Sequence, residues 1–157
     1  MTIKLLAIGK TDNKQLQALI SDYQKRLSHY IKFEFEIIPD LKKVKNLSEA
    51  QQKEKEGHLI LAKLNTTDTL ILLDENGKQM HSVAFSEYLQ KHMNSGMKQL
   101  VFVIGGPYGF SEAVYKKAQG KLSLSKMTFS HQMIRLFMVE QIYRAFTILK
   151  NEPYHHR

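Results

Sequence analysis

Residues 100–106 (LVFVIGG) decide the fold class of this sequence. A continuous run of apolar, mostly β-branched residues is typical of a strand that is buried on both faces, as in the centre of a parallel sheet. A second run of this kind spans 69–74 (TLILLD) and ends in a carboxylate. Ligands of open α/β sheets bind at the carboxyl ends of the strands, and glycines at such an end let a ligand approach the backbone closely. The two strand ends therefore predict one pocket.

Segments that alternate between strand and helix patterns surround these two runs. Further strands are expected at 3–8, at 121–125, and at 33–37, where strict alternation indicates a half-exposed edge strand. Helical spacing of apolar residues predicts helices at 16–30, 48–64, 82–92, from 111, and at 133–148. The pattern predicts an α/β fold with a mostly parallel sheet of about five or six strands and helices on both faces. No linker or repeat divides residues 1–157, so we expect a single domain.

Local signals refine the ends of these elements. Ser48 with Gln51 fits a capping box at the start of the second helix, and Ser82 is expected to cap the third. Asn76-Gly77 is expected to turn the chain directly after the strand at 69–74.

Composition excludes several classes of protein. The 157 residues are 43% hydrophobic and 24% charged, so disordered, collagen-like and coiled-coil chains do not fit. The lack of cysteine excludes a disulfide scaffold, a thiolate nucleophile and a Cys-ligated metal. No apolar run approaches the ~20 residues that cross a bilayer, and the N-terminus lacks the pattern of a signal peptide. We therefore expect a cytoplasmic protein without a membrane segment.

The net charge of +8 is unevenly distributed along the chain. Residues 1–58 carry 11 basic against 8 acidic side chains, 59–110 carry 4 against 4, and 111–157 carry 8 against 3. The last segment also holds His131, His155 and His156. The C-terminal third is therefore the expected contact for phosphates of a nucleic acid, whereas lysine that only keeps the protein soluble is the alternative.

Familiar phosphate and metal motifs do not fit. Gly9-Lys10-Thr11 follows the first strand, but a P-loop would need glycine at position 4, where lysine stands. The run 105–109 (GGPYG) has the wrong spacing for a dinucleotide fingerprint. The histidines lack partners at ligand spacing and HExxH is absent, so no metal site is expected.

Polar groups beside the glycine loop come from the C-terminal third. Residues 123–129 (SLSKMTF) offer hydroxyls and free backbone N–H groups before the last helix, where a plain N-cap is the alternative. His131, Arg135 and Glu140 are expected on the polar parts of that helix. The tail 153–157 (PYHHR) combines a stacking ring, imidazoles and a cation, which suits an unstacked base, whereas a frayed terminus is the alternative.

Five motifs in this order resemble the RlmH family of the SPOUT methyltransferase superfamily. They are 72–78 (LLDENGK), 102–109 (FVIGGPYG), 122–135 (LSLSKMTFSHQMIR), 140–146 (EQIYRAF) and 153–157 (PYHHR). Together with the length and the opening strand, they extend the resemblance over essentially the whole chain. The resemblance implies a methyltransferase that uses S-adenosylmethionine to methylate N3 of a pseudouridine in 23S rRNA, and we expect the assembled ribosome to be the substrate.

The same resemblance implies a topology that general rules treat as nearly absent, with the C-terminal part threaded into a trefoil knot. The cofactor is expected in the knot, held largely by backbone groups of three loops. Carried over by matching motif, the cofactor-binding residues are Leu73, Asp74, Ile104, Gly105, Gly106, Leu124, Ser125, Lys126, Met127, Thr128 and Phe129. The family works as a homodimer, so we expect the last helix to form the interface and the partner's tail to complete each site.

Catalysis by such an enzyme needs alignment of the methyl group and removal of the N3 proton. His155 or His131 is expected to accept this proton, and Arg135 or Arg157 to stabilise the developing anion. Tyr154 is expected to stack on the base or orient it.

Three positions depart from the family pattern. Ser130 stands where a proline is usual, Tyr108 replaces a smaller or acidic residue, and His155-His156 replaces a single histidine, of which His155 is the favoured equivalent.

Two other classes fit parts of the sequence. One is a non-catalytic ribosome- or RNA-binding protein that uses the same basic end. The other is a flavodoxin-like or nucleotide-binding enzyme on an unknotted sheet, although its phosphate loop after the first strand is missing.

Overall fold

The computed structural model describes residues 1–156 and contains a five-stranded sheet in which all neighbouring strands are parallel. The strand order is β2-β1-β4-β3-β5. The strands are β1 (Thr2–Ile8), β2 (Lys32–Ile38), β3 (Thr69–Lys78), β4 (Gln99–Ile104) and β5 (Gly120–Leu122). The helices are α1 (Lys14–Leu27), α2 (Glu49–Ala62), α3 (Ser82–Asn94), α4 (Glu112–Lys117) and α5 (Met133–Leu149), with a 3-10 turn η1 (Val44–Asn46). The predicted parallel α/β sheet is confirmed, and β2 lies at an edge as its alternation predicted.

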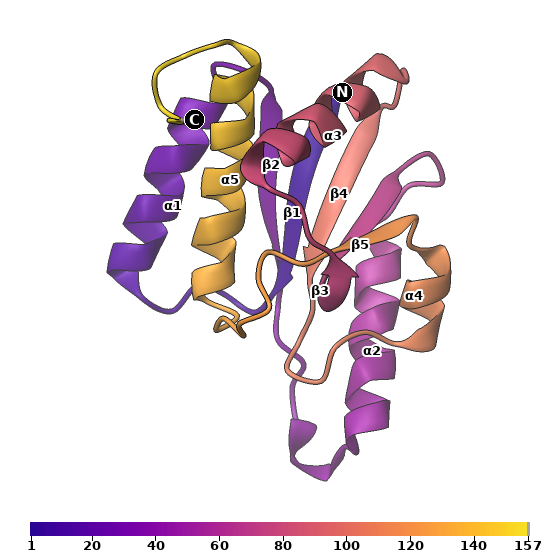
Figure 1. Cartoon of the computed structure of the whole chain (residues 1–157). Coiled ribbons are helices and arrows are strands. Elements are labelled where there is room, and N and C mark those ends of the chain that lie inside the picture. Colours follow the sequence, from indigo (N-terminus) through magenta and orange to yellow (C-terminus); the bar gives the residue numbers. More distant parts are fainter. Residues whose placement is uncertain (157) are drawn as a thin grey trace.

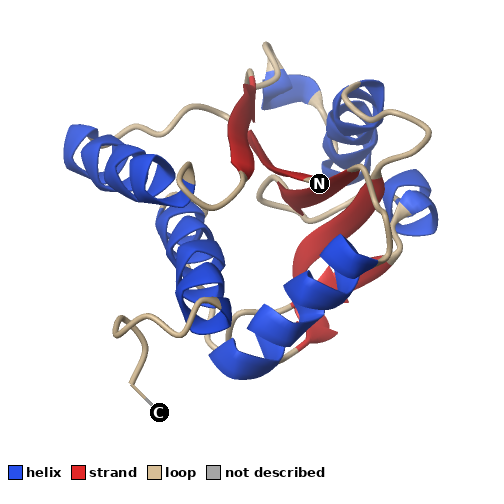
Figure 2. Ribbon diagram, turned by 90° about the horizontal axis from the view of Figure 1, so that it is seen from above, coloured by secondary structure: helices blue, strands red, loops and turns tan. Residues whose placement is uncertain are grey.

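Helices cover both faces of the sheet (Figures 1 and 2). The first, third and fifth helices pack together on one face, and α2 packs with α4 on the other. Leu5 and Phe102 belong to the core under α1, α3 and α5, whereas Leu6 and Val103 belong to the core under α2 and α4. Successive residues of a strand point to opposite faces, so burial on both sides explains why these strands are continuous apolar runs.

The helix starts follow the predicted capping chemistry in one case and depart from it in another. Ser48 and Gln51 form the expected capping box at α2. The predicted cap by Ser82 is wrong, because His81 is the N-cap residue and Ser82 is already helical. The Ser82 hydroxyl instead donates to the Gln141 side-chain oxygen at 2.8 Å, which joins α3 to α5.

The predicted turn at Asn76-Gly77 is also wrong, since β3 continues to Lys78. Its pairing with β5 is irregular between Leu73 and Lys78. Gly77 permits this path, because a Cβ at that position would lie 2.6 Å from the backbone nitrogen of Leu122. Because glycine has no side chain, the two backbones can approach closely here, and β3 continues beyond its apolar run.

A crossing segment, residues 123–132, leads from β5 at the sheet edge to α5 on the face that α1 and α3 share (Figure 1). At its start, the Ser123 N–H donates to the Lys78 carbonyl at 3.0 Å. At its end, the Gln132 side chain donates to the Lys10 carbonyl at 3.2 Å and accepts from the Asp12 N–H at 2.9 Å. These bonds join one end of the crossing segment to the last residue of β3 and the other end to the chain that follows β1.

Arg135 fixes the start of α5 to the end of β1. Its guanidinium donates to the carbonyls of Ile8 and Gly9 at 2.9 and 2.7 Å and to the Thr11 hydroxyl at 3.1 Å. Its Nε donates to the His131 carbonyl at 3.0 Å. The predicted place on a polar part of the helix is wrong, because Arg135 is only 1% exposed. Four of the five N–H donors of the guanidinium therefore bond the chain itself.

Replacing this side chain tests its contribution to the fold. We expect Arg135→Met to lower the free energy of unfolding by about 3 kcal/mol or more, because buried carbonyls of Ile8 and Gly9 lose their donor. Chemical denaturation measures the change. Arg26→Met removes an exposed pair with Asp22 and should cost less than about 1 kcal/mol. Equal losses in the two variants would contradict the assigned role of Arg135.

Candidate functional site

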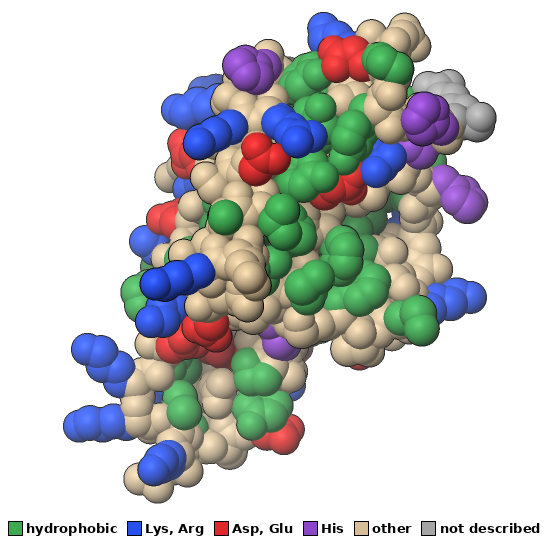
Figure 3. Space-filling model, turned by 90° about the vertical axis from the view of Figure 1, so that its left-hand side faces the viewer, with side chains coloured by type: hydrophobic (Ala, Val, Ile, Leu, Met, Phe, Trp, Pro, Cys, Tyr) green, Lys and Arg blue, Asp and Glu red, His purple; other side chains and the backbone are tan. Residues whose placement is uncertain are grey.

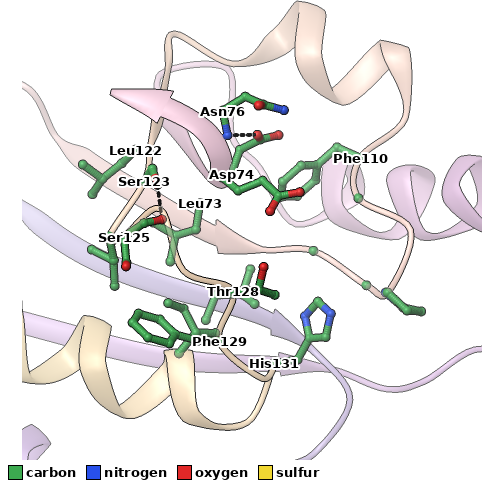
Figure 4. Close-up of a pocket in the computed structure, with 18 of the residues that line it drawn as sticks. Leu73, Asp74, Asn76, Phe110, Leu122, Ser123, Ser125, Thr128, Phe129 and His131 are labelled. Carbon is green, nitrogen blue, oxygen red and sulfur yellow. Dashed lines mark hydrogen bonds between the residues drawn. The ribbon is translucent and has the colours of Figure 1, made fainter. Parts of the chain in front are cut away.

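A cavity of about 420 Å³ opens at the carboxyl ends of β3 and β4 (Figure 4). Three segments that are distant in sequence line it, at 73–76 within β3, at 104–110 and at 122–131, and Tyr115 and Ile134 complete the wall. The two apolar strands thus end at one pocket, as their order and parallel direction predicted.

Asp74 is held on one wall of the pocket. Its carboxylate accepts from the Tyr115 hydroxyl at 2.6 Å and from the Asn76 N–H at 2.8 Å. Burial and the bond to Asp74 raise the pKa of Tyr115 to about 12, so the phenol stays a donor at neutral pH. Figure 4 shows Thr128 and His131 on the opposite side of the cavity. An oriented carboxylate therefore faces a hydroxyl and an imidazole.

The loop before α5 is shaped by its own hydroxyls. The Ser123 hydroxyl donates to the Ser125 carbonyl at 2.9 Å, and the Ser125 hydroxyl accepts from the Met127 N–H at 2.9 Å. Residues 124–129 belong to no helix or strand. Their backbone groups are therefore not committed to a ladder and suit a polar ligand.

The glycine loop is tightly packed on its far side. A Cβ at Gly105 would lie 2.9 Å from the Phe110 ring, and a Cβ at Gly106 would lie 2.4 Å from both carboxylate oxygens of Glu56. Gly109 has a φ of +83°, a conformation that other residues rarely adopt. Close packing thus requires glycine at positions 105 and 106, whereas the backbone conformation favours glycine at position 109.

The structure brings together most of the residues that the sequence assigned to cofactor binding. All of them except Lys126 line the cavity. Lys126 lies on a neighbouring groove that residues 78–91 line from the other side. Sequence reasoning missed Asn76, Phe110 and Tyr115, and no pattern in the sequence distinguishes Tyr115 from an ordinary helix residue.

The expected catalytic residues fall into separate places. His131 lines the cavity. Arg135 is buried in the first turn of α5 and does not line it. Tyr154 and His155 follow the far end of α5, whose 17 residues correspond to a length of about 25 Å. Figure 1 shows this tail at the opposite end of the sheet from the loops of the pocket. Arg157 lies outside the described residues.

The described part of the tail is docked on its own chain. The Tyr154 hydroxyl donates to Glu140 at 2.9 Å and lies 3.2 Å from the Tyr23 hydroxyl. The Arg144 guanidinium lies 4.7 Å from the centre of the Tyr154 ring. Burial, together with the bonds to Tyr23 and Glu140, raises the pKa of Tyr154. These contacts orient Tyr154, so the frayed-terminus interpretation does not hold for this part of the tail.

His155 is oriented by Arg144, whose Nη1 lies 3.1 Å from the imidazole Nδ1. An arginine can only donate, so Nδ1 accepts and the ring hydrogen is on Nε2. Arg144 also donates to Glu140 at 2.6 Å, which fixes the guanidinium. His155 therefore presents an N–H donor, whereas His156 is exposed.

Two departures from the family pattern have a structural role here. The Ser130 hydroxyl accepts from the N–H of Met133, the first residue of α5, at 3.1 Å, although Gln132 is the N-cap residue of this helix. Tyr108 lines the cavity and is 44% exposed, so its side chain contributes to the wall and also contacts solvent.

Two absences apply to residues 1–156. Within this range no group of His, Asp and Glu is arranged to hold a metal ion, and no helix has the length and apolar character needed to cross a membrane.

Comparison with known proteins gives the class of this fold and site. The family model described as "Predicted SPOUT methyltransferase" matches residues 1–155. The chain therefore belongs to the SPOUT methyltransferase family, and its fold is the knotted α/β fold of that family. Such an enzyme uses a methyl donor.

Relatives with a more specific name cover the whole chain. The chain is 77% identical to Ribosomal RNA large subunit methyltransferase H of Flavobacterium johnsoniae, over 100% of both chains. It is 66% identical to the protein of that name from Parabacteroides distasonis and 55% identical to that from Porphyromonas gingivalis, each over 99% of both chains.

The close packing behind Gly106 can be tested directly. Gly106→Ala should lower the free energy of unfolding by about 1–3 kcal/mol, because the new methyl group meets the Glu56 carboxylate. Adding Glu56→Ala makes room, so the double variant should lose less than the sum of the two single changes. Gly120→Ala is a matched control, since its Cβ would meet only the tip of Ile71 at 3.2 Å. If the two losses of unfolding free energy simply add, then the methyl group added at position 106 and the Glu56 carboxylate are not in contact.

Proposed function

We propose that this chain methylates N3 of a pseudouridine in 23S rRNA with S-adenosylmethionine, acting on the assembled ribosome in the cytoplasm. The observation that carries the proposal is the convergence of the segments 73–76, 104–110 and 122–131 on one pocket in a SPOUT family member. The substrate class follows from relatives named as large-subunit rRNA methyltransferases at 55–77% identity. Alignment of residues 1–155 with one family model supports a single domain.

The residues of the pocket fit S-adenosylmethionine. Apolar side chains of Leu73, Ile104 and Leu124 suit the adenine and thioether parts, and the Asp74 carboxylate and the Thr128 hydroxyl suit the polar ends. Gly105 and Gly106 let the ligand reach the backbone. When bound, this cofactor would supply a methyl group activated by a sulfonium.

The chain's own residues must align the acceptor nitrogen and take its proton. His131 lines the pocket and is the proposed proton acceptor. His155 presents a hydrogen on Nε2 and is the proposed donor to a base carbonyl, which stabilises the developing anion. Tyr154 orients the base. Because the guanidinium of Arg135 is buried, Arg157 and not Arg135 is the proposed cation near the substrate.

The separation of tail and pocket supports a homodimer. A tail docked at one end of α5 does not serve a pocket at the other end of the same chain, but a second copy can supply it. Large apolar side chains are exposed near the pocket end of α5: the Phe129 and Phe137 rings lie 5.0 Å apart and Met133 is 40% exposed. Figure 3 shows hydrophobic side chains gathered in the middle of the face on the α1 and α5 side, with Lys and Arg around them. Such a patch suits a twofold contact.

Methyl transfer can be measured with a radioactive methyl donor. We expect purified protein to methylate large-subunit rRNA in ribosomes from a strain that lacks this protein, at a rate at least about tenfold above that with free rRNA. A domain of 157 residues offers little surface to recognise one nucleotide by itself, so the ribosome should supply the rest. Binding of ribosomes without methyl transfer would favour the non-catalytic alternative.

Mixing two inactive variants tests the shared site. Gly106→Val should disrupt the pocket, and His155→Ala should remove the imidazole that the tail supplies. Each homodimer is therefore expected to be inactive. Random exchange gives mixed dimers with one intact site, so about one quarter of the wild-type activity should return. A mixture that stays inactive, despite subunit exchange shown by mass spectrometry, would contradict a tail supplied by the partner.

A further inference from the structure

Glu56 is a buried carboxylate that the proposed methyl transfer does not use. It lies on α2 with 4% of its surface exposed, and its Oε1 has no hydrogen-bond partner among the described residues. Acidic side chains are rarely this buried unless a partner compensates for lost hydration. The burial of this carboxylate without a compensating partner therefore requires an explanation.

The side chain lies directly behind the glycine loop of the pocket. A Cβ added to Gly106 would lie 2.4 Å from Oε1 and from Oε2, so the carboxylate packs against the Gly106 Cα. The next residue, Gly57, is equally close to the loop end, because a Cβ there would lie 2.4 Å from the Ser111 hydroxyl oxygen. Helix α2 thus supports the loop from the side opposite the cavity.

The charges around Glu56 do not stabilise an ionised carboxylate. No Lys, Arg or His nitrogen lies within 4 Å of it in residues 1–156. The titratable group that faces it is Asp40, from the chain after β2, which is another acid. Burial raises the pKa of Glu56, and the charge of Asp40 raises it further, whereas a hydrogen bond from Gln52 opposes them. The uncharged form therefore persists above the usual pH range of a glutamate.

We propose that Glu56 is a positioning residue of the methyl-donor pocket: its uncharged carboxyl supports Gly106 from behind, and its ionisation displaces the glycine loop and weakens cofactor binding. This inference rests on the proposed binding of S-adenosylmethionine between the three loops. It makes α2, which does not line the cavity, a part of the binding machinery.

The sign of the pH effect follows from the direction of the shift. A group whose pKa is raised in the folded protein stabilises it fully at low pH, and this stabilisation is lost as the pH rises through the folded-state pKa. An ionised Glu56 can be hydrated only if its side chain moves away from the glycine loop or if water enters between the carboxylate and the loop. Cofactor affinity should therefore fall on the alkaline side.

Calorimetric titration with S-adenosylmethionine from about pH 6 to about pH 9 tests this. The readout is the ratio of dissociation constants of wild type to Glu56→Gln, because titration of the ligand's own groups cancels in the ratio. Glutamine keeps the shape of the uncharged carboxyl but does not ionise. We expect this ratio to rise with pH, by about tenfold in total, as Glu56 ionises in wild type. Glu54→Gln, an exposed acid of the same helix, should behave as wild type at every pH.

A constant ratio across this range would overturn the proposal. Hydrogen exchange of the ligand-free protein gives a second measurement that does not depend on the ligand. The amides of residues 105–106 and 108–110 should lose protection at alkaline pH in wild type, after correction for intrinsic exchange, and keep it in Glu56→Gln. Equal protection in both proteins would also overturn the role of Glu56. If no variant binds S-adenosylmethionine but the exchange difference appears, then the proposed cofactor is wrong and the support of the loop by Glu56 stands.

Discussion

The buried guanidinium of Arg135 is the contact on which the C-terminal half of the structure depends. It joins the first turn of α5 to the carbonyls of Ile8 and Gly9, where the first strand ends. A charged group with 1% exposure is tolerated only with its donors paired, so α5 has little freedom to start elsewhere. Because β5 ends at the far side of β3, the segment 123–132 must then cross the ends of β3 and β4. That crossing closes the pocket.

The pocket formed in this way is held in shape by contacts within the chain. The Phe110 ring packs against Gly105, the Glu56 carboxylate packs against Gly106, and Asp74 is held by Tyr115. A site of this kind is organised before a ligand arrives, which lowers the ordering that binding requires. The proposed catalytic groups lie apart: His131 lines the pocket, whereas Glu140 and Arg144 orient the tail that follows α5.

The sequence predicted the features that depend on local pattern. Continuous apolar runs identified β3 and β4, and the glycines after β4 placed the pocket at their ends. The path of β3 beyond Asp74 was missed, because the close approach of the Gly77 and Leu122 backbones is a contact between distant segments. The burial of Arg135 was missed for a related reason. Periodicity assigns an isolated arginine to the polar face of a helix, and the carbonyls that accept its hydrogen bonds belong to a distant segment of the chain. Periodicity does not indicate the crossing of a chain through a loop, and only the family resemblance predicted the knot.

Methylation of one pseudouridine of the large-subunit rRNA, from a pocket at the carboxyl ends of β3 and β4, is the function that we propose for this chain. Mass mapping of 23S rRNA from a strain that lacks the protein measures this methylation in the cell. We expect a single pseudouridine-containing fragment to become lighter by one methyl group, and we expect wild-type protein to restore its mass whereas a Gly106→Val variant does not. An unchanged fragment pattern in the deletion strain, or full restoration by Gly106→Val, would contradict it.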